Sequence, residues 1–162
     1  YPIPLKQGDF RVLDKAFEET FDAVICVSNS LPQLHEDEDL VSALSSMRSR
    51  LKRGGVLVLT SGATEATLKL PPIEVVVNRK DFSRIFVKEY DGRFHTIDIV
   101  DLFHSDDRIE SNQHRIVYRV LSDSDYRRLL LEAGFKKVDV YGDYHKTPYG
   151  KDSRRLVVVA VS

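Results

Sequence analysis

Residues 21–59 read as strand, helix and strand in direct succession, and this order constrains the fold more than any other feature. Residues 21–27 are apolar apart from Asp22, which predicts a strand buried on both faces. Residues 37–52 carry apolar side chains at spacings of three and four, which predicts a helix that Gly54-Gly55 ends with a left-handed cap. Residues 56–59 then predict a second buried strand. Such a unit belongs to an α/β domain with parallel strands.

Length and composition narrow the class of protein. A chain of 162 residues has the length of one domain. Its net charge is -1, so it has no excess of basic residues with which to bind nucleic acids or acidic membranes. No apolar run approaches the roughly 20 residues needed to span a bilayer. The single cysteine, Cys26, lies in an apolar run and excludes an internal disulfide, so we expect a reducing, cytoplasmic setting. No histidine pair has helical metal-site spacing, and we expect no metal.

The residue pattern changes between residues 71 and 120 and predicts an inserted antiparallel sheet. Four segments read as strands separated by turn signals: 73–77, 84–90, 93–103 and 109–120. Asp91-Gly92 between two of them is a typical hairpin turn. We expect this sheet to lie over the carboxyl edge of the parallel strands, with residues 61–70 irregular. The whole chain, residues 1–162, is then a single domain with one insertion.

The C-terminal part returns to the α/β pattern. Ser122 and Asp125 have the spacing of a capping box at the start of a helix, and Gly134 is placed to end that helix. Residues 138–141 and 156–161 are then two further strands, joined by a polar loop.

Three segments together resemble class I S-adenosylmethionine-dependent methyltransferases, specifically the glycine N-methyltransferase-like group that acts on small molecules. They are Gly8-Asp9-Phe10 followed by FDAVICVSNSLPQL at 21–34, LKRGGVLVL at 51–59, and LLLEAGFKKV at 129–138. Arg53 stands where the family usually has proline. The resemblance implies a Rossmann-like, mostly parallel sheet with an antiparallel last strand.

The chain departs from the family pattern in one respect. The glycine-rich loop after the family's first strand and the acidic residue after its second are not found in this sequence. We therefore expect the chain to correspond to the domain from about its third strand onward, with the glycine-rich loop in a segment before Tyr1. A natural short form without that loop is the alternative.

The resemblance implies S-adenosylmethionine as cofactor and a set of residues around it. Asp9 and Phe10, at the carboxyl end of the third strand, would contact the adenine, whereas a Gly-Asp turn beside a core phenylalanine is the plainer interpretation. Polar and apolar residues after residue 27 would meet the methionine part of the cofactor or the acceptor. These are Ser28, Asn29, Leu31 and Leu34, and a simple turn cluster is the alternative for them.

Candidates for binding the methyl acceptor follow from its chemistry. A carboxylate on the acceptor would require a bidentate arginine, assisted by tyrosine hydroxyls. The candidates are Arg79, Arg115, Arg119, Tyr118 and Tyr144, although most such arginines are simply solvated. No catalytic residue is predicted, since an activated sulfonium donor mainly requires orientation and exclusion of water.

The resemblance implies an enzyme that transfers a methyl group to a small-molecule acceptor, with an amine as the expected group. A degenerate domain that serves in binding or assembly is the competing hypothesis, and an NAD-dependent enzyme is a weaker third. We expect no nucleic-acid or membrane partner, and the sequence leaves a homo-oligomer open.

Overall fold

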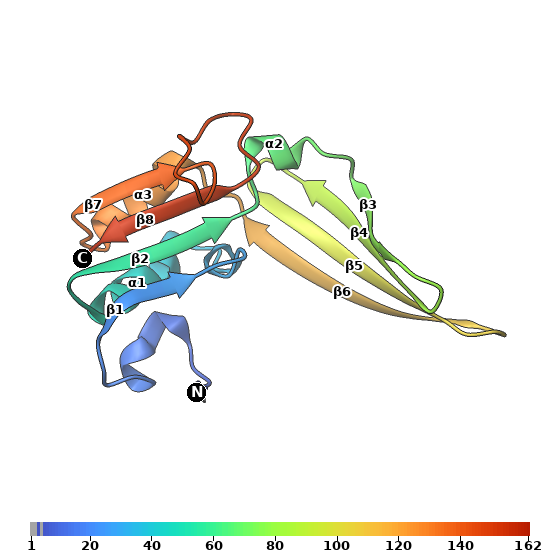
Figure 1. Ribbon diagram of the computed structural model, residues 1–162, viewed down its shortest axis with the longest axis horizontal. Coiled ribbons are helices and arrows are strands. Elements are labelled where there is room, and N and C mark those ends of the chain that lie inside the picture. Colours follow the sequence, from blue (N-terminus) through green and yellow to red (C-terminus); the bar gives the residue numbers. More distant parts are fainter. Residues whose placement is uncertain (1–2, 4) are drawn as a thin grey trace.

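The computed structural model describes residue 3 and residues 5–162, and its first unit is a mixed four-stranded sheet, here called sheet A. Its order is β1-β2-β8-β7, with β1 at Phe21–Cys26, β2 at Leu51–Ser61, β7 at Lys137–Tyr141 and β8 at Leu156–Val161. Strand β2 is parallel to β1, while β8 is antiparallel to both β2 and β7. Three strands therefore run one way and the last strand runs opposite (Figure 1). The antiparallel last strand agrees with the resemblance, but only the pairing of β1 with β2 is parallel, so the sheet is mixed and not mostly parallel in its pairing.

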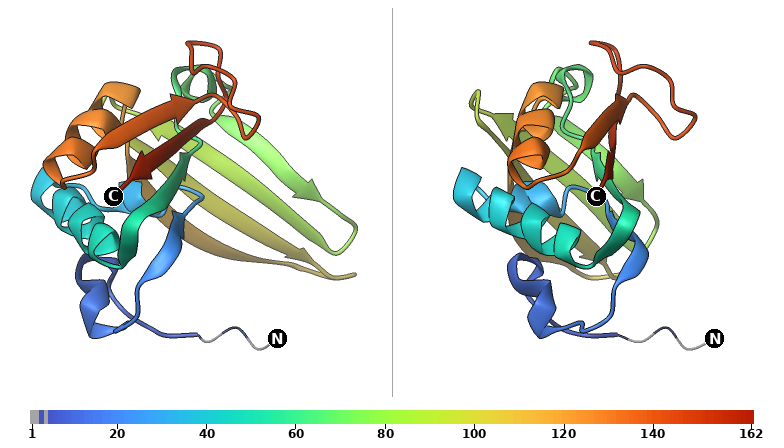
Figure 2. Two further views of the ribbon diagram at one scale, coloured as in Figure 1. Left: turned by 60° about the vertical axis from the view of Figure 1, so that its left-hand side comes forward. Right: turned by 90° about the vertical axis from the view of Figure 1, so that its left-hand side faces the viewer.

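Two helices cover one face of sheet A (Figure 2). Helix α1 spans Asp37–Ser49 and helix α3 spans Asp123–Glu132. Their apolar faces and the inward side chains of β2 and β8 form one core, in which Leu44, Leu130 and Val158 are fully buried. The predicted capping box is present, because Ser122 Oγ accepts from Asp125 N–H and Asp125 Oδ2 accepts from Ser122 N–H.

Strand β1 is the edge of sheet A, and its predicted burial on both faces is wrong. Val24 and Cys26 face the core, but Phe21 and Ile25 remain exposed, Ile25 by 67%. The reason is that burial depends on what lies beside a strand. Among the described residues, helices cover only the other face of sheet A, and no strand pairs with the outer edge of β1.

Gly54 and Gly55 do not cap the helix, contrary to the sequence-based prediction. Helix α1 ends at Ser49, and both glycines lie inside β2 where its register against β1 shifts. Gly54 does adopt the left-handed conformation, with φ of 76°. A side chain at Gly55 would lie 2.9 Å from the carbonyl oxygen of Lys52 and 3.1 Å from that of Asp22. The glycines therefore allow a bulge in the parallel pair.

The predicted inserted sheet, sheet B, is present and purely antiparallel. Its order is β3-β4-β5-β6, with β3 at Ile73–Asn78, β4 at Phe82–Tyr90, β5 at Phe94–His104 and β6 at Ile109–Arg119. It extends away from the carboxyl ends of β1 and β2, and its two outer hairpin turns lie far from sheet A (Figure 1).

Three short helices of the described residues lie outside the two sheets, and one of them, α2, lies between β2 and β3. They are the 3₁₀ helices η1 at Phe10–Lys15 and η2 at Leu31–Gln33, and the α-helix α2 at Glu65–Leu68 within the stretch expected to be irregular. Thr64 and Thr67 form a capping box at α2, which explains a helix there. No helix in residues 3 and 5–162 has the length and apolar character required to cross a membrane.

Candidate functional site

The loop after β1 is a strained turn at the carboxyl end of the parallel strands. Ser28 and Asn29 have φ of 60° and 61°. This left-handed backbone conformation is energetically unfavourable for any residue that carries a side chain. Hydrogen bonds hold it: Asn29 Oδ1 accepts from Gly62 N–H at 2.7 Å, and Ser28 N–H donates to Thr60 Oγ1 at 3.0 Å. The turn thus ties the end of β1 to the end of β2, where ligands bind in open α/β sheets.

The two leucines predicted at this rim face inward. Leu31 is 2% exposed and belongs to the core, and Leu34 packs partly against the same core. Leu31 therefore presents almost no surface to a ligand. Both leucines support the loop from below, and the polar groups of Ser28 and Asn29 form its accessible part.

Asp9 and Phe10 do not follow a strand in the described residues, contrary to the predicted placement. Asp9 caps η1, and its carboxylate pairs with Arg11 at 2.7 Å. Arg11 in turn contacts Asp39 in the first turn of α1 at 2.8 Å. The Arg11 guanidinium lowers the pKa of Asp9 by hydrogen bonding. Phe10 packs partly against the core, so this segment is anchored to α1.

The arginines proposed for acceptor binding either form ion pairs with other residues or lie far from sheet A. Arg115 forms a two-pronged contact with Asp98 on the neighbouring strand, at 2.6 and 2.8 Å. Arg119, only 15% exposed, lies 2.6 Å from Asp37 and also donates to the His35 carbonyl. Arg79 lies in the outer turn between β3 and β4, far from sheet A (Figure 1).

The two tyrosines proposed with them lie apart. Tyr118 is opposite His95, which in turn is opposite Tyr90, so the three form a row across β6, β5 and β4. Burial raises the pKa of Tyr118 and lowers that of His95, and Lys88 lowers the latter further. Tyr144 is exposed, with the Arg155 guanidinium 4.8 Å from its ring centre. The structure does not bring the predicted acceptor residues together.

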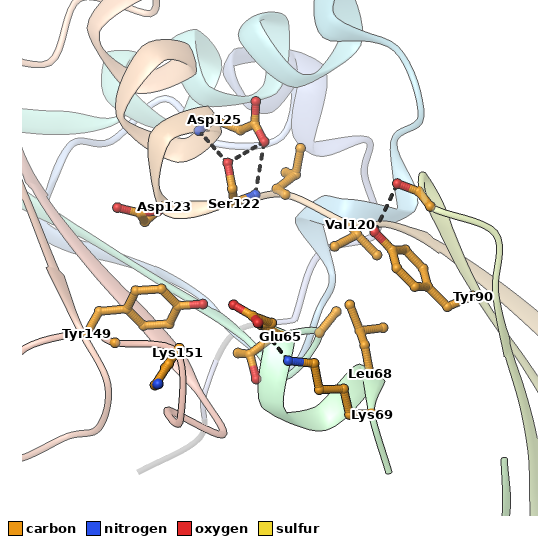
Figure 3. A pocket seen from close by; sticks show the side chains of 15 residues that line it. Glu65, Leu68, Lys69, Tyr90, Val120, Ser122, Asp123, Asp125, Tyr149 and Lys151 are labelled. Carbon is orange, nitrogen blue, oxygen red and sulfur yellow. Dashed lines mark hydrogen bonds and ion pairs between the residues drawn. The ribbon is translucent and has the colours of Figure 1, made fainter. Parts of the chain in front are cut away.

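A cleft of about 700 Å³ lies instead between sheet A and sheet B, and four segments line it (Figure 3). They are residues 63–69 around α2, the turn between β4 and β5, residues 120–125 before and within α3, and residues 149–151 of the loop between β7 and β8. A smaller hollow of about 290 Å³ shares Leu68 and Tyr90 with it and reaches His95. We call the larger hollow the α2 cleft.

Charged and phenolic groups line the α2 cleft, and some of them are already engaged. Glu65 pairs with Lys69 at 2.7 Å, and the Tyr90 hydroxyl donates to the Gly92 carbonyl (Figure 3). Asp123 and Tyr149 are half-buried, and within the described part of the chain neither side chain forms a hydrogen bond or ion pair. Burial raises the pKa of Tyr149, and the nearby carboxylates of Asp123 and Glu65 raise it further.

The chain has curated relatives of low but consistent similarity. It is 27% identical over 157 residues to the glycine/sarcosine/dimethylglycine N-methyltransferase of Actinopolyspora halophila, covering 90% of this chain and 25% of that protein. It is 28% identical over 159 residues to the glycine/sarcosine N-methyltransferase of Aphanothece halophytica, covering 94% and 56%. The chain thus spans a quarter to little more than half of the length of these relatives. No protein-family model matches it.

Solved structures match nearly the whole chain. A methyltransferase from Clostridium acetobutylicum described as S-adenosylmethionine-dependent superposes with a TM-score of 0.81 at 14% identity, over 95% of this chain and 62% of that one. The chain has a methyltransferase fold. The sugar N-methyltransferase KedS8 from Streptoalloteichus superposes with a TM-score of 0.78 at 22% identity, over 98% and 62%. The resemblance inferred from the three sequence segments is confirmed at the level of fold and relatives.

Sequence reasoning missed the cleft residues of this methyltransferase-fold chain. Tyr90, Asp123 and Tyr149 come from three separate segments, and nothing in their local sequence marks them as neighbours. Only their position in the chain could have indicated some of these residues, because residues that directly follow a strand at the carboxyl edge of the sheet usually contact the ligand in α/β domains. Applied to the end of β2, that rule points to residues 62–65.

Proposed function

We propose that this chain is part of an S-adenosylmethionine-dependent methyltransferase that methylates an amine of a small molecule. The observation that carries the proposal is the Ser28–Asn29 turn, which holds two left-handed residues at the carboxyl end of β1. Backbone strain of this kind persists where the surrounding structure enforces it, and it is enriched at binding sites. The curated relatives named as N-methyltransferases support the choice of reaction.

The residues at this turn suit the polar end of the cofactor. Asn29 uses its amide oxygen on Gly62, while its amide nitrogen takes part in no hydrogen bond to the described residues and is available as a donor. The exposed Ser28 hydroxyl adds a second polar group. We assign these two side chains to the methionine part of the cofactor, with Leu31 and Leu34 as support beneath them. Asp9, with acceptor capacity left beside Arg11, and Phe10 are proposed for the adenine.

The acceptor is proposed to enter from the α2 cleft. Gly62, whose N–H is bound by Asn29, is followed directly by Ala63 and Thr64 in the wall of the cleft. One short segment therefore separates the proposed cofactor turn from the cleft. Of the residues predicted from the sequence for acceptor binding, none lines this cleft.

The chemistry required of the chain is modest. S-adenosylmethionine, when bound, would supply a methyl group on a positively charged sulfur, which the acceptor nitrogen would displace. The chain must hold the acceptor nitrogen in line with the methyl group and the sulfur, and it must limit the access of water to the cleft. The proton that leaves the nitrogen is taken up by a side chain or passes to water. Tyr90 and Tyr149 provide hydroxyl groups and ring surface for that positioning.

Calorimetric titration of the full-length protein with S-adenosylhomocysteine tests the cofactor assignment. We expect one site per chain, with binding about tenfold weaker in Asn29→Ala, since one hydrogen bond of about 1.4 kcal/mol is lost. Asn112→Ala, on β6 of sheet B, is the matched control and should bind as the wild type does. Absence of binding at millimolar ligand would favour a degenerate domain that serves in assembly.

A further inference from the structure

We propose that His95 is a catalytic residue of this chain, and that its imidazole accepts the proton that the acceptor nitrogen gives up. This inference rests on the proposed function and assigns a residue to its proton step. His95 is the second residue of β5 and lines the hollow of about 290 Å³ beside α2. That hollow shares Leu68 and Tyr90 with the α2 cleft (Figure 3), so an acceptor in the cleft reaches His95 between these two side chains.

The His95 ring is buried, but its polar atoms are unused. The residue is 9% exposed, and within residues 3 and 5–162 neither ring nitrogen forms a hydrogen bond or an ion pair. By contrast, the His35 ring contacts the Val117 carbonyl at 3.3 Å. The His104 ring likewise contacts the Ser83 hydroxyl at 3.1 Å. Because buried polar groups that serve only the fold are normally hydrogen-bonded, the free imidazole of His95 indicates a ligand contact.

The ring nitrogens of His95 remain open to the hollow. Among the described residues, the polar side-chain atoms that are fully buried without a hydrogen bond belong to Asp37 and Arg48, not to His95. Each nitrogen of His95 therefore keeps some accessible surface, although the residue as a whole is buried. Since His95 lines the smaller hollow, that surface is available to a ligand there.

Titratable groups on three strands surround His95. They are Glu74 of β3, Lys88, Glu89 and Tyr90 of β4, and Tyr118 of β6. Lys88 pairs with Glu74 at 2.6 Å, while Glu89 is exposed and interacts with Arg115. Both carboxylates of this set are thus engaged with cations rather than with His95. The α2 residues that line the hollow carry no titratable group.

These surroundings keep the imidazole neutral near pH 7. Tyr90 and Tyr118 lie directly opposite His95 on the same face of sheet B, and they add ring surface without charge. Burial lowers the pKa of His95, and the Lys88 ammonium lowers it further. A neutral imidazole can accept a proton from an amine, whereas a carboxylate would favour the charged ammonium, which has no lone pair for the reaction.

The proton step balances with His95 and water alone. The acceptor ammonium gives one proton to a free ring nitrogen of His95. The electron pair of the broken nitrogen–hydrogen bond stays on the acceptor nitrogen as the lone pair that attacks the methyl group. The imidazolium then passes the proton to water, and its lowered pKa favours this release.

Chemical modification tests whether the ring is reachable, and it requires no substrate. Diethyl pyrocarbonate acylates neutral imidazoles, and peptide mass spectrometry of the full-length protein locates the product. We expect His95 to react at pH 7, more slowly than the exposed His114 of β6, and to lose reactivity with a midpoint below the ordinary pKa of 6.5. An unreactive His95 in folded protein would overturn the proposal, since the ring would then be closed to ligands.

Methyl transfer by His95→Gln tests the catalytic role. The full-length protein is assayed with S-adenosylmethionine carrying a trideuterated methyl group and with glycine, sarcosine or glucosamine as acceptor. We expect kcat at pH 7 to fall about 100-fold with little change in KM, as for the loss of a general base. In the wild type kcat should rise with pH through the pKa of His95, and this rise should be absent from the variant. His114→Gln is the matched control and should retain both the rate and the rise.

The outcomes separate this inference from the proposed function. A wild type that methylates an amine, together with a His95→Gln variant of unchanged kcat, would overturn the role of His95 alone. A variant that is slower but keeps the rise of kcat with pH would also overturn it, because a merely structural role leaves that profile in place. A wild type that methylates none of the three amines would contradict the proposed function itself.

Discussion

Arg119 at the end of β6 lies 2.6 Å from Asp37 at the start of α1, so one ion pair joins the base of sheet B to the helical layer over sheet A. Arg119 also donates to the His35 carbonyl at 3.0 Å, and Asp37 is contacted by Arg128 of α3 at 2.8 Å. Phe94 of β5 packs against the His35 ring, with 5.1 Å between ring centres. The orientation of sheet B over the carboxyl ends of β1 and β2 therefore depends on this cluster.

Replacing Arg119 by methionine should destabilise the protein. The mutation removes a guanidinium that is 15% exposed and leaves Asp37 and the His35 carbonyl with fewer donors. We expect the free energy of unfolding in urea to fall by about 1–2 kcal/mol, because hydrogen bonds to charged groups contribute about that much when partly shielded from water. Arg115→Met, at an exposed pair on the same strand, is the control. An equal loss in the two variants would show that the pair with Asp37 has no special role.

The same pair predicts a dependence on acidity. The Arg119 guanidinium, 2.6 Å from the carboxylate, lowers the pKa of Asp37 below its ordinary value, and the pairing with Arg128 adds to this. The pair thus stabilises the fold fully above about pH 4, where an unfolded aspartate ionises, and this stability is lost as the pH falls through the lower folded pKa. In urea unfolding at pH 7 and pH 3, the gap between wild type and Arg119→Met should narrow at pH 3. A gap that is constant with pH would contradict this account.

Ser28 allows a test of backbone strain in the turn after β1. Its φ of 60° is energetically unfavourable for a residue with a branched side chain and is readily adopted by glycine. Ser28→Val should lower the free energy of unfolding by about 1–2 kcal/mol, whereas Ser28→Gly should leave it nearly unchanged. Urea unfolding of both variants measures this. Equal stability of the two would mean that the turn relaxes and is not enforced.

Gly55 tests the bulge in β2. A methyl group there would lie 2.9 Å from one backbone carbonyl oxygen and 3.1 Å from another, and a backbone atom yields less easily than a side chain. Gly55→Ala should therefore lower the free energy of unfolding by about 1–3 kcal/mol. Gly150→Ala is the control, because a side chain at Gly150 meets no atom within 4 Å, and its thermal midpoint should hardly move.

Features set by nearby residues were predictable from the sequence. The capping box of Ser122 and Asp125, the helix end at Gly134 and the strands of sheet B all depend on spacing over a few positions, and the structure confirms them. Gly54 was correctly expected to be left-handed, but the sequence pattern did not show that the helix ends earlier and that the glycine serves a bulge.

Features set by distant residues were not predictable in this way. The exposure of Ile25 depends on what packs against β1, and the engagement of Arg115 depends on Asp98 across a strand pair. The α2 cleft combines four segments spread over residues 63–151. Such juxtapositions follow from the topology, so the sequence could supply candidate residues for the acceptor but could not select among them.

Methyl transfer to an amine of a small molecule is the activity proposed for the full-length protein. The most direct measurement incubates the full-length protein with S-adenosylmethionine carrying a trideuterated methyl group and with glucosamine, glycine or sarcosine, and follows the products by mass spectrometry. The account predicts a trideuteromethyl group on the nitrogen of at least one of these amines. A cofactor that binds but leaves every amine unlabelled, under conditions where the protein is folded, would contradict the account.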